Sequence, residues 1–206
     1  MRRRSASSTR ALRLLARPAL AALSLALLLT ALAGCGTAEE KRDVADSTGL
    51  FHFKVPAEWQ FQVTSGTTSV YAAEALPEGG AEADALAIVA MVSDTTTETP
   101  VPEALVEYVA YWGETRGWTN VEAGEPVDAT VGGRAASRVD ITATDGNGRA
   151  FRAAYIWVRT NDREVLITAV TPPANWDTYA ADLDAVLTDW YWHRPEGTSA
   201  EETTTP

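Results

Sequence analysis

Hydrophobic and polar residues alternate strictly along residues 50–55. This alternation predicts a β-strand with one face in the core and the other in water. Shorter stretches at 60–64 and 68–73 also have strand character. Three further stretches carry apolar residues on both sides: 85–92, 150–158 and 165–170. Strands of that kind are buried on both faces, so other elements must cover each side of the sheet.

Two stretches with helical spacing are available for this cover. The first runs from about Pro102 to Arg116, and Gly117 is suited to end it. The second runs from about Asn175 to Trp190. Each places its apolar residues on one stripe and most of its acidic residues off that stripe, which is typical of helices that pack on a sheet.

Tight turns between the strands determine the fold class. Gly132-Gly133 and the Asp-Gly-Asn-Gly run at 145–148 are typical of β-hairpins. Strands joined in this way form a mainly antiparallel sheet. We therefore predict an α+β fold in which a sheet of about six or seven strands lies between helices on both faces, an α/β/α sandwich.

The first 34 residues follow another pattern. Six arginines and no acidic residue accompany an apolar run that begins at Ala19 and ends beside Cys35. A basic head, an apolar segment of about 7–15 residues and a small-residue cleavage site form a secretory signal. A membrane-spanning helix needs roughly 20 apolar residues. We therefore predict a signal peptide over residues 1–34; the alternative is an uncleaved anchor followed by an ordinary buried thiol at Cys35.

The motif Leu32-Ala33-Gly34-Cys35 resembles the lipobox of bacterial lipoproteins. The resemblance implies that a diacylglyceryl group is attached to Cys35, that the peptide is cut before this residue, and that the new amino terminus is acylated, as with palmitate. Cys35 is the only cysteine, so it forms no intramolecular disulfide. Because two or more acyl chains give stable anchoring, we expect an extracytoplasmic protein anchored to the cell membrane through Cys35.

Charge narrows the range of partners. Removal of residues 1–34 leaves 11 basic residues against 28 acidic ones, a formal net charge of −17. Nucleic-acid binding needs Lys and Arg to displace phosphate counterions, and anionic lipid surfaces attract basic segments. The composition therefore argues against a nucleic-acid partner and against a domain that lies flat on anionic lipid.

The remaining chain divides by composition into three parts. Residues 35–49 are polar and without hydrophobic periodicity, which predicts a flexible tether. Residues 50–195 hold all the predicted elements and fit a single domain. Residues 196–206 are polar, and we expect a disordered tail there.

Three stretches of the domain resemble the PsbP-like superfamily and, within it, the actinobacterial LpqN/LpqT-type lipoproteins. They are FKVPAEW at 53–59, GRAA at 133–136 and TAVTPPANW at 168–176. The resemblance implies an antiparallel sheet between helices, in agreement with the periodicity. It also implies an accessory, scaffold or binding role without catalysis, in the setting of the cell envelope.

Residues that could carry catalysis are few. The only histidines, His52 and His193, are predicted to be solvated surface side chains, and without a further cysteine a zinc or copper site is not expected. The run at 145–148 resembles the start of a calcium loop but lacks the later glutamate, so we favour a hairpin. A Ser-His-Asp triad forms only in space, and the sequence leaves it open. We predict no catalytic residue, no cofactor and no metal, hence no enzyme.

Aromatic residues are the remaining signal. Trp112, Trp157 and Trp176 are expected to pack helices against the sheet. Three consecutive aromatics at 190–192 cannot all face inward, so at least one is expected to be exposed. Exposed aromatics are enriched at protein interfaces, which makes Tyr191 and Trp192 a candidate partner or ligand surface. The alternative is that they only cover an edge of the sheet.

These observations favour a membrane-anchored, non-enzymatic accessory protein that binds an envelope protein or an apolar envelope ligand. A hydrolase of envelope material and a purely structural surface protein are the alternatives. A cleft holding a histidine beside a carboxylate would favour the hydrolase.

Overall fold

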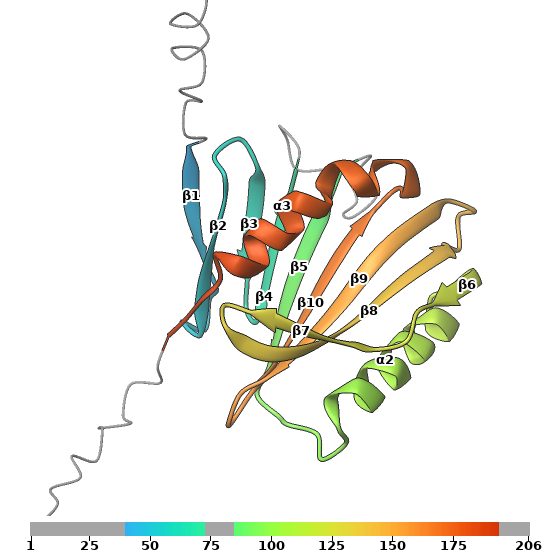
Figure 1. Cartoon of the computed structure of the whole chain (residues 1–206), viewed down its shortest axis with the longest axis horizontal. Helices are drawn as coiled ribbons and strands as arrows, with labels where there is room; N and C mark the ends of the chain where they lie inside the picture. Colours follow the sequence, from blue (N-terminus) through green and yellow to red (C-terminus); the bar gives the residue numbers. More distant parts are fainter. Residues whose placement is uncertain (1–39, 73–84, 194–206) are drawn as a thin grey trace, which may run out of the picture. The chain divides into compact units, whose positions relative to one another are not determined.

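The computed structural model describes residues 40–72 and 85–193, which form two antiparallel sheets and two α-helices (Figure 1). Within these residues the larger sheet has eight strands, in the order β3-β4-β5-β10-β9-β8-β6, and β7 also pairs with β8. Its strands are β3 (Gln60–Thr64), β4 (Thr67–Tyr71), β5 (Ala87–Ser93), β6 (Thr119–Ala123), β7 (Val127–Val131), β8 (Arg134–Thr144), β9 (Ala150–Arg159) and β10 (Glu164–Thr171). The predicted fold class is confirmed, with more strands than the periodicity indicated.

The three central strands are apolar on both faces, as predicted. Along β10, Val165, Ile167 and Ala169 belong to one core cluster, whereas Leu166 on the opposite face belongs to another. Leu166 lies opposite Met91 of β5 and Trp157 of β9. The sheet therefore separates two apolar layers, and each needs its own cover.

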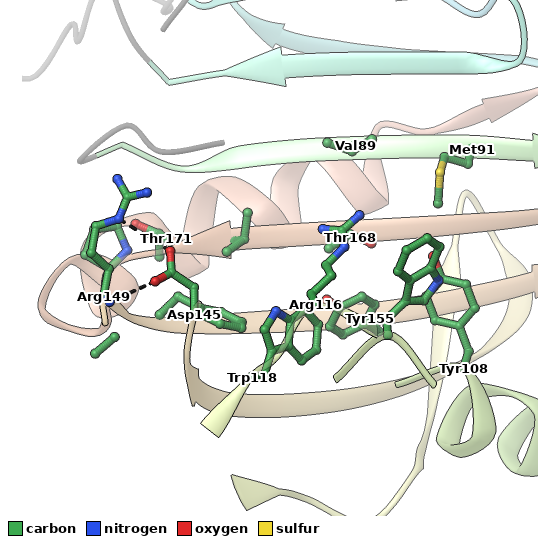
Figure 2. Close-up of a pocket in the computed structure, with 15 residues that line it drawn as sticks. Val89, Met91, Tyr108, Arg116, Trp118, Asp145, Arg149, Tyr155, Thr168 and Thr171 are labelled. Carbon is green, nitrogen blue, oxygen red and sulfur yellow. Dashed lines mark hydrogen bonds and ion pairs between the residues drawn. The ribbon is translucent and has the colours of Figure 1, made fainter. Parts of the chain in front are cut away.

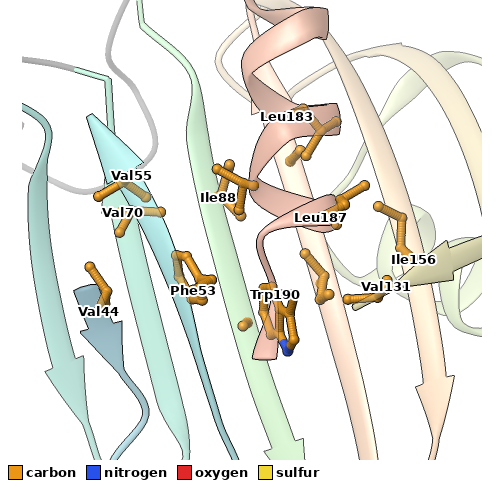
Figure 3. Close-up of a cluster of buried hydrophobic side chains, with 14 of the residues drawn as sticks. Val44, Phe53, Val55, Val70, Ile88, Val131, Ile156, Leu183, Leu187 and Trp190 are labelled. Atoms are coloured by element: carbon orange, nitrogen blue, oxygen red, sulfur yellow. The ribbon is translucent and has the colours of Figure 1, made fainter. Parts of the chain in front are cut away.

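The first layer lies under helix α3 (Trp176–Thr188), which follows a short 3-10 turn at Pro173–Asn175. Figure 3 shows Leu183 and Leu187 of α3 pointing toward Ile156 and Ile88 of the sheet. All four side chains are buried. Burial of a Leu or Ile side chain contributes roughly 1.5–3 kcal/mol, so this contact is a major source of the stability of the domain.

A second sheet of three strands completes this layer: β1 (Lys41–Ala45), β2 (Phe51–Pro56) and β11 (Tyr191–Trp192), in the order β1-β2-β11. Val44 of β1 is only 1% exposed. In the following turn, Asp46 accepts hydrogen bonds from the backbone N–H groups of Thr48 (2.7 Å) and Phe51 (2.9 Å). The prediction of a flexible tether through residue 49 is therefore wrong for residues 41–49. They belong to the folded domain, because one buried valine and one capping aspartate suffice to hold this short edge strand.

The second layer lies under helix α2 (Val101–Thr115), which agrees with the predicted helix to within one residue. Leu105 and Val109 of α2 pack against Val139, Ile141 and Tyr155 of β8 and β9. Helix α2 thus covers one side of this face, and the same face of β5 and β10 lies beside it. Among the described residues, no helix has the length and apolar character that a membrane crossing requires.

Both predicted hairpin turns are present. Gly132 and Gly133 connect β7 to β8, with φ values of +53° and +76°. Residues 145–148 connect β8 to β9, as expected. Sequence analysis did not predict β6 and β7, because the side chains of β6 are all exposed and those of β7 mostly so. It also missed β8, where buried positions alternate regularly but several of them hold small or polar residues.

Candidate functional site

A cavity of about 300 Å³ lies beside α2 on the second face of the large sheet. Figure 2 shows Asp145 and Arg149 at one end and Met91 and Tyr108 at the other. The floor is formed by β5, β10 and β9, and the C-terminal half of α2 forms the wall. The lining is mainly apolar and aromatic: Val89, Met91, Tyr108, Trp112, Arg116, Trp118, Asp145, Arg149, Ala150, Phe151, Tyr155, Thr168, Val170, Thr171 and Pro172.

The local sequence explains why a cavity forms here. Side chains at Val89 and Met91 alternate with the buried Ile88 and Ala90 of the other layer, so they point to the α2 side. Because α2 packs over β8 and β9, no helix among the described residues covers Val89 and its neighbours on β10. The result is an apolar floor with a wall on one side.

Aromatic rings shape the wall. Tyr108 and Trp112 are separated by four positions on α2, and the centres of their rings are 6.0 Å apart. The two residues therefore share one side of the helix. Beyond the helix, the centre of the Trp118 ring lies 5.1 Å from that of Phe151 and 6.3 Å from that of Tyr155. Rings in such contact hold each other in place. The cavity is thus bordered by a preformed aromatic surface, which suits a planar or aliphatic ligand group.

One end of the cavity is a polar turn. The Asp145 carboxylate accepts hydrogen bonds from the backbone N–H groups of Asn147 (2.8 Å) and Arg149 (2.8 Å), and the Arg149 guanidinium lies 3.4 Å from it. These contacts, the Arg149 N–H foremost, hold the pKa of Asp145 below its usual value. The Asp145 carboxylate is therefore ionised at neutral pH and already bonded within its own turn.

Arg116 differs from Arg149 in its surroundings. Its guanidinium lies 4.6 Å from the centre of the Trp112 ring, a cation–π contact. Figure 2 shows its side chain extending from the end of α2 over the cavity, near Trp118 and Tyr155. No carboxylate forms an ion pair with Arg116 among the described residues. The cavity thus carries a positive charge that no described acidic group neutralises.

Two tyrosines, Tyr108 and Tyr155, line the same cavity. Burial raises the pKa of Tyr155 strongly, and the neighbouring Tyr108 adds to this, while the charge of Arg116 opposes it. Burial also raises the pKa of Tyr108, against the effects of Arg116 and a hydrogen bond with Trp112. Both phenols therefore remain protonated well above neutral pH and are available as hydrogen-bond donors.

A second hollow of about 380 Å³ shares Met91 and Tyr108 with the first. It extends along the same strands toward Glu164. The Glu164 carboxylate forms an ion pair with Arg159, with Nε and Oε1 2.8 Å apart. The indole N–H of Trp157 is buried in its wall without a hydrogen-bond partner among the described residues. Together the two hollows follow β10 over its length, about 23 Å at roughly 3.3 Å per residue.

The predicted surface at Tyr191 and Trp192 lies elsewhere, on β11 at the edge of the small sheet. Tyr191 is 57% exposed, in line with the expectation. Trp192 instead donates a hydrogen bond from Nε1 to the Val131 carbonyl (2.7 Å), and the Arg134 guanidinium lies 4.9 Å above its ring. Trp192 therefore connects β11 to the end of β7, which agrees with the alternative that it covers an edge of the sheet. Tyr191 stays a candidate contact residue.

The two histidines are not isolated solvated side chains, contrary to the prediction. His52 Nδ1 and His193 Nε2 are 3.0 Å apart, and Asp43 lies 4.0 Å from His52 Nε2. Pairing of β11 with β2 places Tyr191 opposite His52, which brings residues far apart in sequence into contact. In the described part of the chain these histidines form a hydrogen bond with each other but none with a serine or threonine hydroxyl, Asp43 lies nearby, and neither histidine lines a hollow.

Of the three tryptophans expected to pack helices on the sheet, Trp176 is buried as predicted, whereas Trp112 and Trp157 are half-buried and line the hollows. Sequence analysis missed the role of these two residues because neither the helical spacing around Trp112 nor the strand alternation around Trp157 distinguishes the buried centre of an apolar face from its edge. The alternating apolar residues of β5 and β10 were the available signal.

Other predictions fall partly outside the described residues. Cys35, the signal peptide and residues 196–206 lie outside 40–72 and 85–193. Within those ranges, no group of three or more His, Cys, Asp or Glu side chains has the arrangement of a metal site.

No protein-family model and no curated protein matches this chain. Solved structures do resemble it, each with a TM-score of 0.53. Cyanobacterial PsbP (CyanoP) from Synechocystis sp. PCC 6803 has 11% identity over 78% of this chain and 98% of that chain. The Saccharomyces cerevisiae Ran-binding protein Mog1p has 15% identity over 75% and 96%. LpqN, involved in cell envelope biogenesis of Mycobacterium tuberculosis, has 15% identity over 75% and 91%.

At these identities the likeness establishes the fold. The domain has a PsbP/Mog1-like fold, which agrees with the resemblance seen in the three sequence stretches.

Proposed function

We propose that this protein is an extracytoplasmic lipoprotein, anchored through Cys35, that binds an apolar ligand of the cell envelope without catalysis. The observation that carries the proposal is the aromatic-lined cavity beside α2, continued along β10 by the second hollow. A volume of about 300 Å³ lies at the lower end of the range for small-ligand sites. The mainly apolar floor favours a ligand that water solvates poorly.

The comparisons support this proposal without deciding it. The neighbour whose name mentions the envelope is LpqN, which is described as involved in cell envelope biogenesis. The same family was indicated by the sequence stretches at 53–59, 133–136 and 168–176. Membership of the LpqN/LpqT-type lipoproteins and an actinobacterial origin are part of the proposal, and the lipobox is the observation that supports an anchor.

The binding proposal is tested by filling the cavity. Val89→Trp adds a large side chain to the floor, while Val127→Trp makes the same change on β7 at a residue that is 55% exposed. Lipids extracted from the purified full chain, made in its own host, are compared by mass spectrometry. We expect a co-purifying amphiphile in the wild type and in Val127→Trp that is lost in Val89→Trp. Equal lipid content in all three would contradict the proposal.

Anchoring is tested separately by Cys35→Ala. We expect the wild-type chain in the membrane fraction with a mass increment from acylation, and the variant without either. An unmodified wild-type Cys35 would refute the lipoprotein assignment but leave the binding proposal untouched.

A hydrolase is the second candidate, because His52, His193 and Asp43 form a contiguous group on the surface. If this group is catalytic, His52→Asn abolishes turnover of ester substrates by the purified chain, while Tyr111→Phe on α2 does not. The cavity and the histidines lie in different parts of the domain, so the two candidates are distinguished by which variant loses function.

A further inference from the structure

Arg116 stands out from other arginines of the large sheet and its loops. Arg138 is paired with Asp140 at 2.8 Å, Arg159 with Glu164 at 2.8 Å and Arg163 with Asp94 at 3.3 Å. Acidic residues outnumber basic ones across this chain, 28 to 17. Arg134 and Arg152 also lie over tryptophan rings without a carboxylate partner among the described residues, but of these three arginines only Arg116 lines either hollow.

The groups around Arg116 are donors of hydrogen bonds. Tyr108 and Tyr155 line the same cavity as Arg116, and Figure 2 shows the Arg116 side chain near Tyr155. Both phenols are protonated at neutral pH, as argued above. A guanidinium and two phenol side chains that line one cavity offer hydrogen-bond donors to an oxyanion, because each oxygen of a carboxylate or phosphate accepts such bonds.

The rest of the cavity does not fit a free anion. Val89, Met91, Val170 and Phe151 offer no polar atom on their side chains. The polar turn at one end, whose Gly146 lies against the Arg116 backbone, has its own carboxylate, Asp145, which is paired with Arg149 and would repel a second negative charge there. A ligand that uses the whole cavity therefore has one anionic group near Arg116 and an apolar remainder along β5 and β10.

We propose that the cavity binds an amphiphile with a single oxyanion head, carboxylate or phosphate, whose head is held by Arg116 with Tyr108 and Tyr155. The inference rests on the proposed function of the same site and adds the chemical class of the ligand. The apolar tail lies on the floor at Val89 and Met91 and continues toward the second hollow.

The test compares an anionic probe with its neutral counterpart. The full chain is inserted in phosphatidylcholine nanodiscs, and binding of octyl phosphate and of octanol is measured by tryptophan fluorescence, with protein-free nanodiscs subtracted. Hydrogen bonds to charged groups are worth about 1.5–3 kcal/mol, so we expect octyl phosphate to bind about ten- to a hundredfold more tightly than octanol.

Arg116→Gln is expected to reduce the affinity for octyl phosphate to that for octanol, whereas Arg116→Lys retains most of the preference. The matched control is Arg134→Gln, because Arg134 also lies over a tryptophan ring, at 4.9 Å against 4.6 Å for Arg116, but far from the cavity. Tyr155→Phe, which removes only a hydroxyl, gives an independent loss of several-fold and does not depend on the folding of Arg116→Gln.

The outcomes separate the two levels of the argument. Equal binding of octyl phosphate and octanol, or unchanged binding in both Arg116→Gln and Tyr155→Phe, overturns the anionic head but keeps an apolar ligand. Competition by inorganic phosphate at the same concentration as octyl phosphate overturns the amphiphile and leaves an anion site. Absence of binding by both amphiphiles refutes the apolar-ligand function together with this inference.

Discussion

Gly132→Ala should destabilise the domain far more than the same change at the next residue. An alanine Cβ at Gly132 would lie 2.1 Å from the Trp190 carbonyl oxygen and 3.0 Å from Cδ1 of Trp192. At Gly133 a Cβ would have no neighbour within 4 Å. Both glycines have a positive φ, so both variants incur the cost of a left-handed alanine, about 1–2 kcal/mol. The difference between the variants therefore isolates the steric contact with the C-terminal segment.

The magnitude follows from what must move. The turn and the Trp190 carbonyl would have to separate by about 1.3 Å to reach an ordinary contact distance of about 3.4 Å, and forced overpacking costs about 1–3 kcal/mol. The Gly132 N–H also donates to the Leu187 carbonyl at 2.8 Å, and Trp192 donates to Val131 at 2.7 Å. Each bond contributes about 1 kcal/mol. We expect a loss of about 4 kcal/mol or more for Gly132→Ala against about 1–2 kcal/mol for Gly133→Ala.

Urea unfolding of the full chain, followed by tryptophan fluorescence, measures both free energies. A typical domain is stable by only about 5–15 kcal/mol, so the Gly132 variant should unfold at a much lower urea concentration. If the two variants differ by less than about 1 kcal/mol, the turn after β7 does not hold the C-terminal segment. The argument that Trp192 is a structural residue would then fail.

Two further predictions concern stability. Val44→Ala removes two buried methyl groups and should lower the free energy of unfolding, measured in urea, by about 2 kcal/mol. Val127→Ala, at an exposed position, should change it little. An unaffected Val44 variant would restore the flexible-tether interpretation of residues 41–45. The raised pKa of Tyr155 means that its contribution to stability is fully present below about pH 10 and is lost as the pH rises through the folded-state value. Tyr155→Phe should therefore make unfolding less sensitive to alkaline pH than the wild type, while Tyr111→Phe, on the exposed side of α2, should not; identical pH profiles for Tyr155→Phe and wild type would refute the burial argument.

Much of the architecture was accessible from local pattern. The helices at α2 and α3, the hairpin at 145–148 and the two-sided burial of β5, β9 and β10 all follow from spacing of apolar residues and from turn-forming glycines. The edge strands were harder to predict. β6 has exposed side chains throughout and β11 has only two residues, so neither produces a periodic signal.

The candidate site was harder to predict than the fold for a related reason. Trp112 and Leu105 belong to the same helical stripe, yet Leu105 is buried and Trp112 borders a cavity. Which of them faces open space depends on where α2 lies across the sheet. The contact between His52 and His193 likewise exists only because β11 returns to pair with β2.

The sequence alone therefore determined which segments bury apolar surface, because hydrophobic periodicity is a local property of each strand and helix. The stretch 32–35 that resembles a lipobox is likewise a local pattern of consecutive residues, and the lipid anchor that it indicates stays a prediction. Only the tertiary structure decided that α2 lies over β8 and β9, that the same face of β5 and β10 forms the floor of a cavity, and that Arg116 lies over it. The position of a helix on a sheet depends on the shape and volume of many side chains together, and no single stretch of sequence contains that information.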